Sequence, residues 1–126
     1  MLISKKGYIL KKYKAKIKLV IKSDRTNFYG PGINELLILI DQYQSTKEAA
    51  GAMGLSYSKA LKIIKRCENE LGFDIIKSQR GGADGGKSIL TDEGRKIMTA
   101  YKDFNDEVNE DLEEKFYKYF SFLDKN

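Results

Sequence analysis

Apolar residues and lysines alternate near the start of the chain, between Tyr13 and Lys22. A period of two places successive apolar side chains on one face, and the β-branched residues among them favour extended backbone. The pattern predicts a half-buried strand over 13–22, then a turn at 23–26 and a short second strand at 27–29 that pairs back. Lysines on an edge strand also suppress aggregation between sheets, so we do not assign these lysines to DNA.

A helical pattern replaces the alternation after the segment GPG at positions 30–32. Pro31 suits the first turn of a helix, where its missing N–H is not needed. The next segment, INELLILIDQY, offers Leu36, Leu37, Leu39 and Ile40 to a core. We therefore expect a helix that supplies much of the buried apolar area and carries no chemistry.

Two capped helices separated by a glycine are predicted within residues 45–72. Ser45 and the glutamate three residues later have the spacing of a capping box, so a helix is expected to begin near residue 46. Gly54 suits the left-handed position just past the end of this helix, and Ser56 can cap a second helix over 57–71. A short helix, a turn and a second helix have the layout of a helix-turn-helix.

The helix predicted over 57–71 separates into two faces at 100° per residue. One broad arc is apolar and contains Tyr57, Ala60, Leu61, Ile63, Ile64, Cys67 and Leu71. The opposite arc is polar and basic and contains Ser58, Lys59, Lys62, Lys65, Arg66 and Asn69. Glu68 projects near the apolar arc, where it needs a marginal position or a partner. Alone, the pattern also fits an amphipathic helix with a solvated lysine face, but its neighbours along the chain favour DNA.

Two short strands are predicted after this helix, at 73–79 and 87–90, with a glycine-rich loop over 80–86 between them. A helix-turn-helix followed by a hairpin is a winged helix. Arg80 and Lys87 would reach phosphate or the minor groove from this loop. The segment lacks the strand-to-helix setting of a nucleotide-binding loop, and a hairpin tip without a partner is the alternative to a DNA contact.

The last third of the chain carries one apolar stripe at helical spacing. Thr91 is suited to the N-cap, and two acidic residues follow it near the positive end of the helix dipole. A continuous helix from Asp92 to Leu123 would be about 48 Å long at 1.5 Å per residue, more than so small a domain can cover. We therefore expect a homodimer with this helix as its main seam; folding back within one chain is the alternative.

Composition bounds the function further. The chain has 126 residues, one cysteine and no histidine, which excludes a disulfide framework and removes the common zinc ligand sets. It also removes the usual combination of nucleophile, base and orienting residue. Cys67 is interpreted as a core residue. No apolar run of about 20 residues and no signal-peptide pattern is present, so we expect a cytoplasmic protein that is not an enzyme and needs no cofactor or metal.

The net charge of +5 is unevenly distributed along the chain. Residues 1–30 carry a net +8, residues 31–44 carry −2, residues 45–90 carry +3 and residues 91–126 carry −4. A basic front attracts nucleic acid and an acidic tail is repelled by it. The distribution therefore agrees with double-stranded DNA as the partner.

The segments GPG, AAGAMGLSYSKA and RGGADGGKSILTDEG, in this order, resemble the N-terminal DNA-binding domain of ModE-type regulators. These are molybdate-responsive transcription regulators related to the LysR family, and the resemblance covers position 30 to about 101. It implies a dimeric winged helix whose second helix enters the major groove and whose long helix joins the subunits. ModE-type regulators carry oxyanion-binding domains after the long helix, whereas this sequence ends at Asn126, so molybdate is not expected to bind this chain.

The expected fold is mainly α with small β: a winged helix-turn-helix with an N-terminal β-hairpin and a long C-terminal dimerisation helix. The expected parts are a basic hairpin segment over 1–29, a DNA-binding domain over 30–90 and a dimerisation helix over 91–126. The expected function is sequence-specific DNA binding by a homodimeric transcription regulator. The alternative is a winged-helix module for protein interaction without specific DNA binding.

Individual residues are assigned to the expected contacts with DNA and with a second copy of the chain. Base edges are assigned to Ser58, Lys59 and Lys62, near the start of the second helix. Backbone phosphates are assigned to Ser45, Thr46, Lys47, Lys65 and Arg66, the wing contact to Arg80 and Lys87, and a phosphate hydrogen bond or simple packing to Tyr57. The dimer interface is assigned to Tyr101, Phe104, Val108, Leu112, Phe116 and Tyr119.

Overall fold

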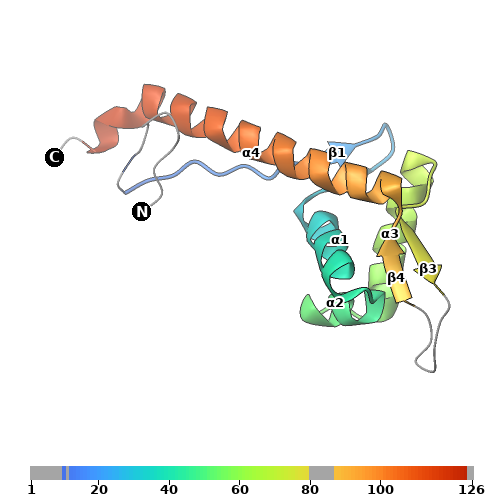
Figure 1. The fold of residues 1–126 in the computed structure, drawn as a ribbon. Helices are drawn as coiled ribbons and strands as arrows, with labels where there is room; N and C mark the ends of the chain where they lie inside the picture. Colours follow the sequence, from blue (N-terminus) through green and yellow to red (C-terminus); the bar gives the residue numbers. More distant parts are fainter. Residues whose placement is uncertain (1–9, 11, 80–86, 125–126) are drawn as a thin grey trace. The chain divides into compact units, whose positions relative to one another are not determined.

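The computed structural model describes residues 10, 12–79 and 87–124 and is mainly helical, with two small antiparallel sheets and a long C-terminal helix (Figure 1). The elements are β1 (Ile21–Lys22), β2 (Asn27–Tyr29), α1 (Pro31–Tyr43), α2 (Thr46–Ala52), α3 (Tyr57–Leu71), β3 (Ile76–Gln79), β4 (Lys87–Leu90), α4 (Asp92–Phe120) and a final 3-10 turn, η1 (Ser121–Asp124). No helix in the described ranges is long and apolar enough to cross a membrane.

The chain divides into two compact units. One unit is Leu19–Tyr101, which contains both sheets, the first three helices and the start of α4. The other joins the remaining N-terminal residues to the part of the chain that begins at Lys102. The candidate DNA-contacting residues of the described chain all lie in the unit 19–101.

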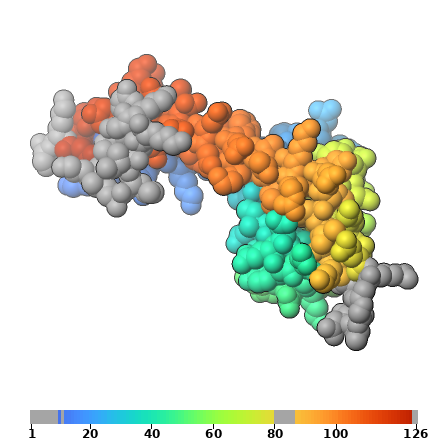
Figure 2. Space-filling model, in the orientation of Figure 1, coloured from blue at the N-terminus to red at the C-terminus, as the bar shows by residue number. Residues whose placement is uncertain are grey.

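The core of the unit 19–101 is built around α1. Its residues Ile33, Leu36, Leu37 and Ile40 are buried at the spacing of one helical face. Small residues of α2 and the inner face of α3 pack on them, together with one residue just before β3 and one from β4: Ala49, Ala50, Ala60, Ile64, Cys67, Ile75 and Leu90. Figure 2 shows the segments coloured cyan to yellow in contact with one another. The core role predicted for α1 is confirmed, except that Leu39 is only half-buried.

The N-terminal strand is much shorter than predicted. Residues 13–20 form no strand, and β1 contains only Ile21 and Lys22, which pair with β2. The partner explains the difference, because β2 has three residues and a strand extends only as far as its hydrogen-bonding partner. The predicted turn is present, and the Ser23 N–H donates to the Thr26 carbonyl over 2.9 Å.

The second hairpin pairs Ile76 with Leu90 and Gln79 with Lys87 in antiparallel register. Its first strand was predicted over 73–79 but begins at Ile76. The backbone carbonyls just before Ile76 accept hydrogen bonds from Thr91 and are not available for strand pairing. The carbonyl of Ile75 accepts from the Thr91 N–H over 3.0 Å, and the carbonyl of Asp74 accepts from the Thr91 hydroxyl over 2.7 Å. The predicted loop 80–86, with Arg80, lies outside the described residues.

Helix α4 begins at the predicted cap and ends before the predicted residue. The Thr91 hydroxyl accepts from the Gly94 N–H over 2.9 Å, which satisfies one free donor of the first turn. Gly94 is buried where the helix crosses Ile75, and a Cβ at this position would lie 2.1 Å from the Ile75 carbonyl oxygen. The α-helix ends at Phe120 and η1 follows it, whereas the stripe predicted a single helix to Leu123.

Candidate nucleic-acid interface

The start of α3 is fixed by local contacts. Ser45 caps α2 by accepting from the Glu48 N–H over 3.1 Å, and Ser56 caps α3 by accepting from the Lys59 N–H over 3.1 Å. Gly54 lies between the two helices with a φ of +70°, which few side chains tolerate. The chain thus turns sharply between α2 and α3, and the bounds predicted for α3 are confirmed.

The outward face of α3 is basic. Its exposed residues include Ser58, Lys59, Lys62, Lys65, Arg66 and Asn69, the same six that the helical pattern assigned to the polar arc. The apolar arc is narrower than predicted, because Tyr57 is 50% exposed and Leu61 36% exposed. Both side chains therefore belong with the outward face of α3.

Glu68 finds partners inside the unit 19–101. Its carboxylate is buried and accepts from the N–H of Ile75 over 2.8 Å and from that of Ile76 over 3.4 Å. Lys65 Nζ lies 3.6 Å from its other oxygen. The carboxylate therefore ties the inner edge of α3 to the start of β3 and adds no exposed negative charge to the basic face.

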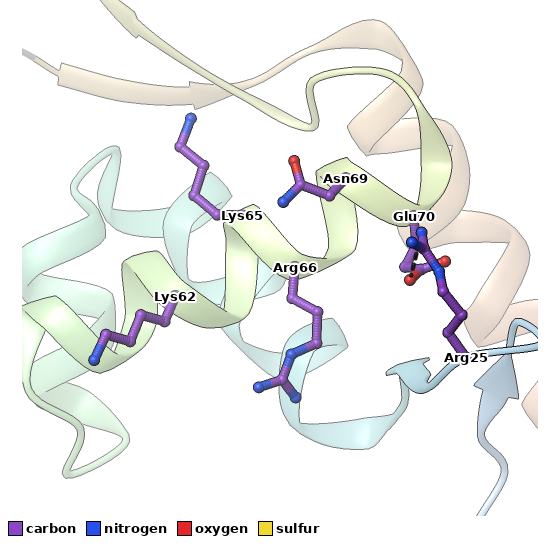
Figure 3. A pocket seen from close by; sticks show the side chains of 6 residues that line it. All are labelled: Arg25, Lys62, Lys65, Arg66, Asn69 and Glu70. Atoms are coloured by element: carbon purple, nitrogen blue, oxygen red, sulfur yellow. Dashed lines mark ion pairs between the residues drawn. The ribbon is translucent and has the colours of Figure 1, made fainter.

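Two shallow grooves run along the basic face. The first is lined by Arg25, Lys62, Lys65, Arg66, Asn69 and Glu70 (Figure 3). The second lies towards the N-terminus of α3 and is lined by Ser56, Ser58, Lys59, Lys62, Ile63 and Arg66. Lys62 and Arg66 belong to both grooves, so five of the predicted contact residues lie around one continuous surface.

Arg25 is a member of this surface that the sequence analysis did not select. It comes from the turn between β1 and β2, and its guanidinium lies 3.2 Å from the Glu70 carboxylate at the end of α3. The pairing of the hairpin with the helix is a tertiary contact, which no helical or strand period reveals. The only sequence signal for Arg25 was its basic side chain in a predicted turn.

The other residues assigned to DNA occupy different surroundings. Thr46 is buried, and the hydroxyl of Ser45 already caps α2, so these two side chains have little to offer a phosphate. Lys47 is exposed on α2 and Lys87 is exposed at the start of β4. Arg80 lies outside the described residues.

The residues assigned to the dimer interface divide into three groups. Tyr101 is buried in the unit 19–101, where its hydroxyl donates to the Leu19 carbonyl over 2.9 Å and its ring packs on Tyr29. Phe104 is 50% exposed and Tyr119 is 64% exposed. Val108, Leu112 and Phe116 are half-buried.

Burial favours the neutral forms of a thiol and a phenol in the core. Burial and, to a smaller extent, the nearby Glu68 carboxylate raise the pKa of the Cys67 thiol to about 12. Burial likewise raises the pKa of the Tyr29 phenol. A thiol with so high a pKa is a poor nucleophile. In the ranges 10, 12–79 and 87–124, no three metal-ligating side chains are grouped to hold an ion.

Comparison with known proteins gives one informative similarity. No family model matches the chain. The chain is 35% identical to the molybdenum-pterin-binding protein MopB of Rhodobacter capsulatus over 66 residues. The aligned residues make up 52% of this chain and 24% of the relative. The chain therefore spans about a quarter of the relative's length. The similarity supports a relation to ModE-type proteins.

Proposed function

We propose that this protein is a DNA-binding transcription regulator in which α2 and α3 form a helix-turn-helix and β3 and β4 form a wing. The observation that carries the proposal is the outward face of α3. Four cationic side chains lie on it, Lys59, Lys62, Lys65 and Arg66, while the two carboxylates beside them, Glu68 and Glu70, are buried or paired. Such a face is complementary to the phosphates that border a groove of duplex DNA.

The dimensions of α3 and the position of its polar residues suit a helix that reads the major groove. That groove is about 12 Å wide and admits an α-helix, and in helix-turn-helix proteins the N-terminal residues of the second helix contact base edges. Ser58, Lys59 and Lys62 occupy this position and are assigned to base edges. Lys65 and Arg66 lie further along and are assigned to phosphates.

We further propose a homodimer joined along α4. The support is the exposure of apolar side chains on this helix and on η1, among them Phe104, Phe120 and Phe122. The rings of Phe120 and Phe122 lie 6.3 Å apart, and neighbouring exposed apolar side chains mark interaction sites in soluble proteins. A two-fold dimer would present two copies of α3 to two half-sites of one operator.

Molybdate is proposed not to act on this chain directly. The name of the relative refers to molybdenum-pterin binding, but the similarity covers only 24% of that protein. The cationic groups of the present site are exposed to water, and exposed charge pairs contribute about 0–1 kcal/mol each. A single oxyanion would therefore be held weakly there, whereas a duplex makes many such contacts at once.

Fluorescence anisotropy tests the proposal. Duplexes selected from a random pool by the protein would be compared with scrambled versions at about 50 and about 200 mM salt, with and without molybdate. The selected duplex should bind roughly a thousandfold tighter than the scrambled one, both affinities should fall with salt, and molybdate should change neither. Equal affinity for every duplex would contradict sequence-specific regulation and favour the protein-interaction module.

A further inference from the structure

The exposed face of α3 is bordered by a different element at each edge. Glu68 binds the backbone at the start of β3, and Glu70 binds Arg25 in the turn between β1 and β2. Residues two apart in an α-helix point about 200° apart. The β3–β4 hairpin and the N-terminal hairpin therefore flank α3 on nearly opposite sides.

Arg25 projects from the N-terminal turn into the basic groove. Its side chain is 77% exposed, and it lines the groove together with Lys62, Lys65 and Arg66. In Figure 3 its guanidinium lies beside Glu70, and Lys65 points away from Arg66. The ion pair is made through Nη2, and a guanidinium has five N–H donors. Donors therefore remain for a second anion.

The turn that carries Arg25 is fixed by its own hydrogen bonds. The Ser23 hydroxyl accepts from the N–H of Arg25 over 3.1 Å and from that of Thr26 over 3.2 Å. The Ser23 N–H also donates to the Thr26 carbonyl. Because the backbone is ordered before any ligand binds, little conformational entropy is lost when Arg25 makes a contact.

We propose that the β1–β2 turn is a second DNA-contacting hairpin, in which Arg25 donates to a backbone phosphate at the edge of α3 opposite the β3–β4 hairpin. This inference rests on the proposed function. Arg25 belongs at a phosphate and not at a base, because it stands at the border of the exposed face while Ser58 and Lys62 occupy its middle. Glu70 is the positioning residue, since its carboxylate lies 3.2 Å from the guanidinium and both side chains line the groove.

A competing role for Arg25 is neutralisation of Glu70. A bare carboxylate beside the groove would repel phosphate, and an arginine that merely cancelled this charge would also favour binding. The two roles differ when Glu70 is itself neutral. Direct contact by Arg25 then still contributes to affinity, whereas neutralisation has nothing left to cancel.

The test combines Arg25→Ala, Glu70→Gln and the double variant, with Lys102→Ala as the matched control. Lys102 is also an exposed cation paired with a carboxylate, that of Asp106, but it does not line the groove. Anisotropy would be measured on a selected and a scrambled duplex over a salt series. Arg25→Ala should weaken both duplexes by the same factor of roughly five to ten and lower the salt slope by about 0.9, the value of one phosphate. Arg25→Gln should do likewise, because it can keep a hydrogen bond to Glu70 without the charge.

Each outcome decides the matter. The proposal requires that replacing Arg25 with alanine still lowers DNA affinity in the Glu70→Gln protein. It also requires that Lys102→Ala leaves the salt dependence of binding unchanged. It is overturned if Arg25→Ala behaves like Lys102→Ala, or if its effect disappears in the Glu70→Gln protein. A wild-type protein that binds neither duplex would instead overturn the proposed function, and this inference with it. Circular dichroism would confirm that each variant is folded.

Discussion

Glu68 joins α3 to the β3–β4 hairpin through a single carboxylate. It is buried on the inner edge of α3 and accepts from two consecutive backbone N–H groups at the start of β3. A buried carboxylate costs free energy unless hydrogen bonds compensate for lost hydration. The paired donors provide this compensation and fix the distance between helix and hairpin.

Replacing Glu68 should therefore destabilise the protein in a graded way. Glu68→Ala leaves the buried Ile75 N–H without an acceptor and should lower the free energy of unfolding by about 1–3 kcal/mol. Glu68→Gln keeps an acceptor oxygen and should cost clearly less. Urea denaturation of the two variants checks the order. Equal losses would show that the hydrogen bond to Ile75 is not what stabilises this contact.

Gly94 allows α4 to approach the backbone of Ile75 closely. A Cβ at this position would lie 2.1 Å from the Ile75 carbonyl oxygen, so the start of α4 would have to move away from the strand. Gly94→Ala should lower the free energy of unfolding by about 1–3 kcal/mol or more. The matched control is Gly51→Ala, because Gly51 is also helical and its Cβ would meet no atom within 4 Å. That change should stabilise by about 0.5–1 kcal/mol. Thermal unfolding of both variants measures these changes. Equal destabilisation by the two replacements would contradict the role given to Gly94.

Single residues were predictable where their role is local. The caps Ser45, Ser56 and Thr91 all accept the predicted backbone hydrogen bonds, because a cap depends on a few neighbours along the chain. The exposure of Tyr57 and Leu61 was not predictable from helical spacing. It depends on which elements cover the first turns of α3, and only tertiary structure decides this.

At the scale of elements, an ion pair joins the end of α1 to the start of α4. Both guanidinium η nitrogens of Arg95 donate to Asp41, over 3.1 and 2.6 Å. The hydrogen bond from Arg95 and its positive charge hold the pKa of the Asp41 carboxyl below its usual value. Bidentate geometry makes this pair stronger than most surface pairs.

The Asp41 pair should make stability depend on acid pH. A carboxyl whose pKa is lowered by folding stabilises the native state above its unfolded pKa, about 3.9, and this contribution is lost as the pH falls through the folded pKa. The free energy of unfolding of wild type should exceed that of Asp41→Asn by at most about 1 kcal/mol at pH 7, since the ion pair is partly exposed. The difference should shrink below pH ~4. Urea denaturation at pH 7 and pH 3 measures it, and a difference that grew in acid would contradict the assignment.

Helices were easier to predict than strands at this scale. The bounds of α3 follow from Ser56 and Gly72, which are local signals. The extent of a strand depends on its partner, and the partners β2 and β4 are only three and four residues long. Alternation over 13–22 therefore predicted a strand whose greater part has no neighbour to pair with.

At the scale of the whole molecule, α4 leaves several large apolar side chains exposed. Tyr101 is buried and hydrogen-bonded within its own chain, whereas Phe104 and Tyr119 remain largely exposed. Leaving such groups in water is unfavourable by roughly 25 cal/mol per Å² of apolar surface. A second copy packed along the helix would remove this cost.

A charge at Phe104 should disrupt the proposed dimer. Multi-angle light scattering should give wild type about twice the chain mass of 14.4 kDa, and Phe104→Glu should shift the population towards a single chain, because a buried unpaired carboxylate is costly. Thr99→Glu serves as the control, since Thr99 is exposed on the same helix and lies about 140° away from position 104. A wild-type mass of one chain would contradict the dimer.

The overall plan of the molecule was predictable to the level of mainly helical architecture, two small hairpins and a long last helix. The groove on α3 was predictable in part, because Lys62, Lys65 and Arg66 share a face by helical geometry alone. Arg25 reaches the same groove only through the packing of the N-terminal hairpin against α3. Long-range contacts of this kind have no signature in residue spacing.

The most direct test of the central claim, that α3 reads DNA sequence, is the ratio of affinities for a selected duplex and its single-base variants, measured for wild type and Lys62→Ala. If Lys62 contacts a base edge, its removal should change discrimination at one position by about 1–3 kcal/mol and leave the other positions as they were. A uniform loss on every duplex would contradict the assignment and reduce Lys62 to a phosphate contact.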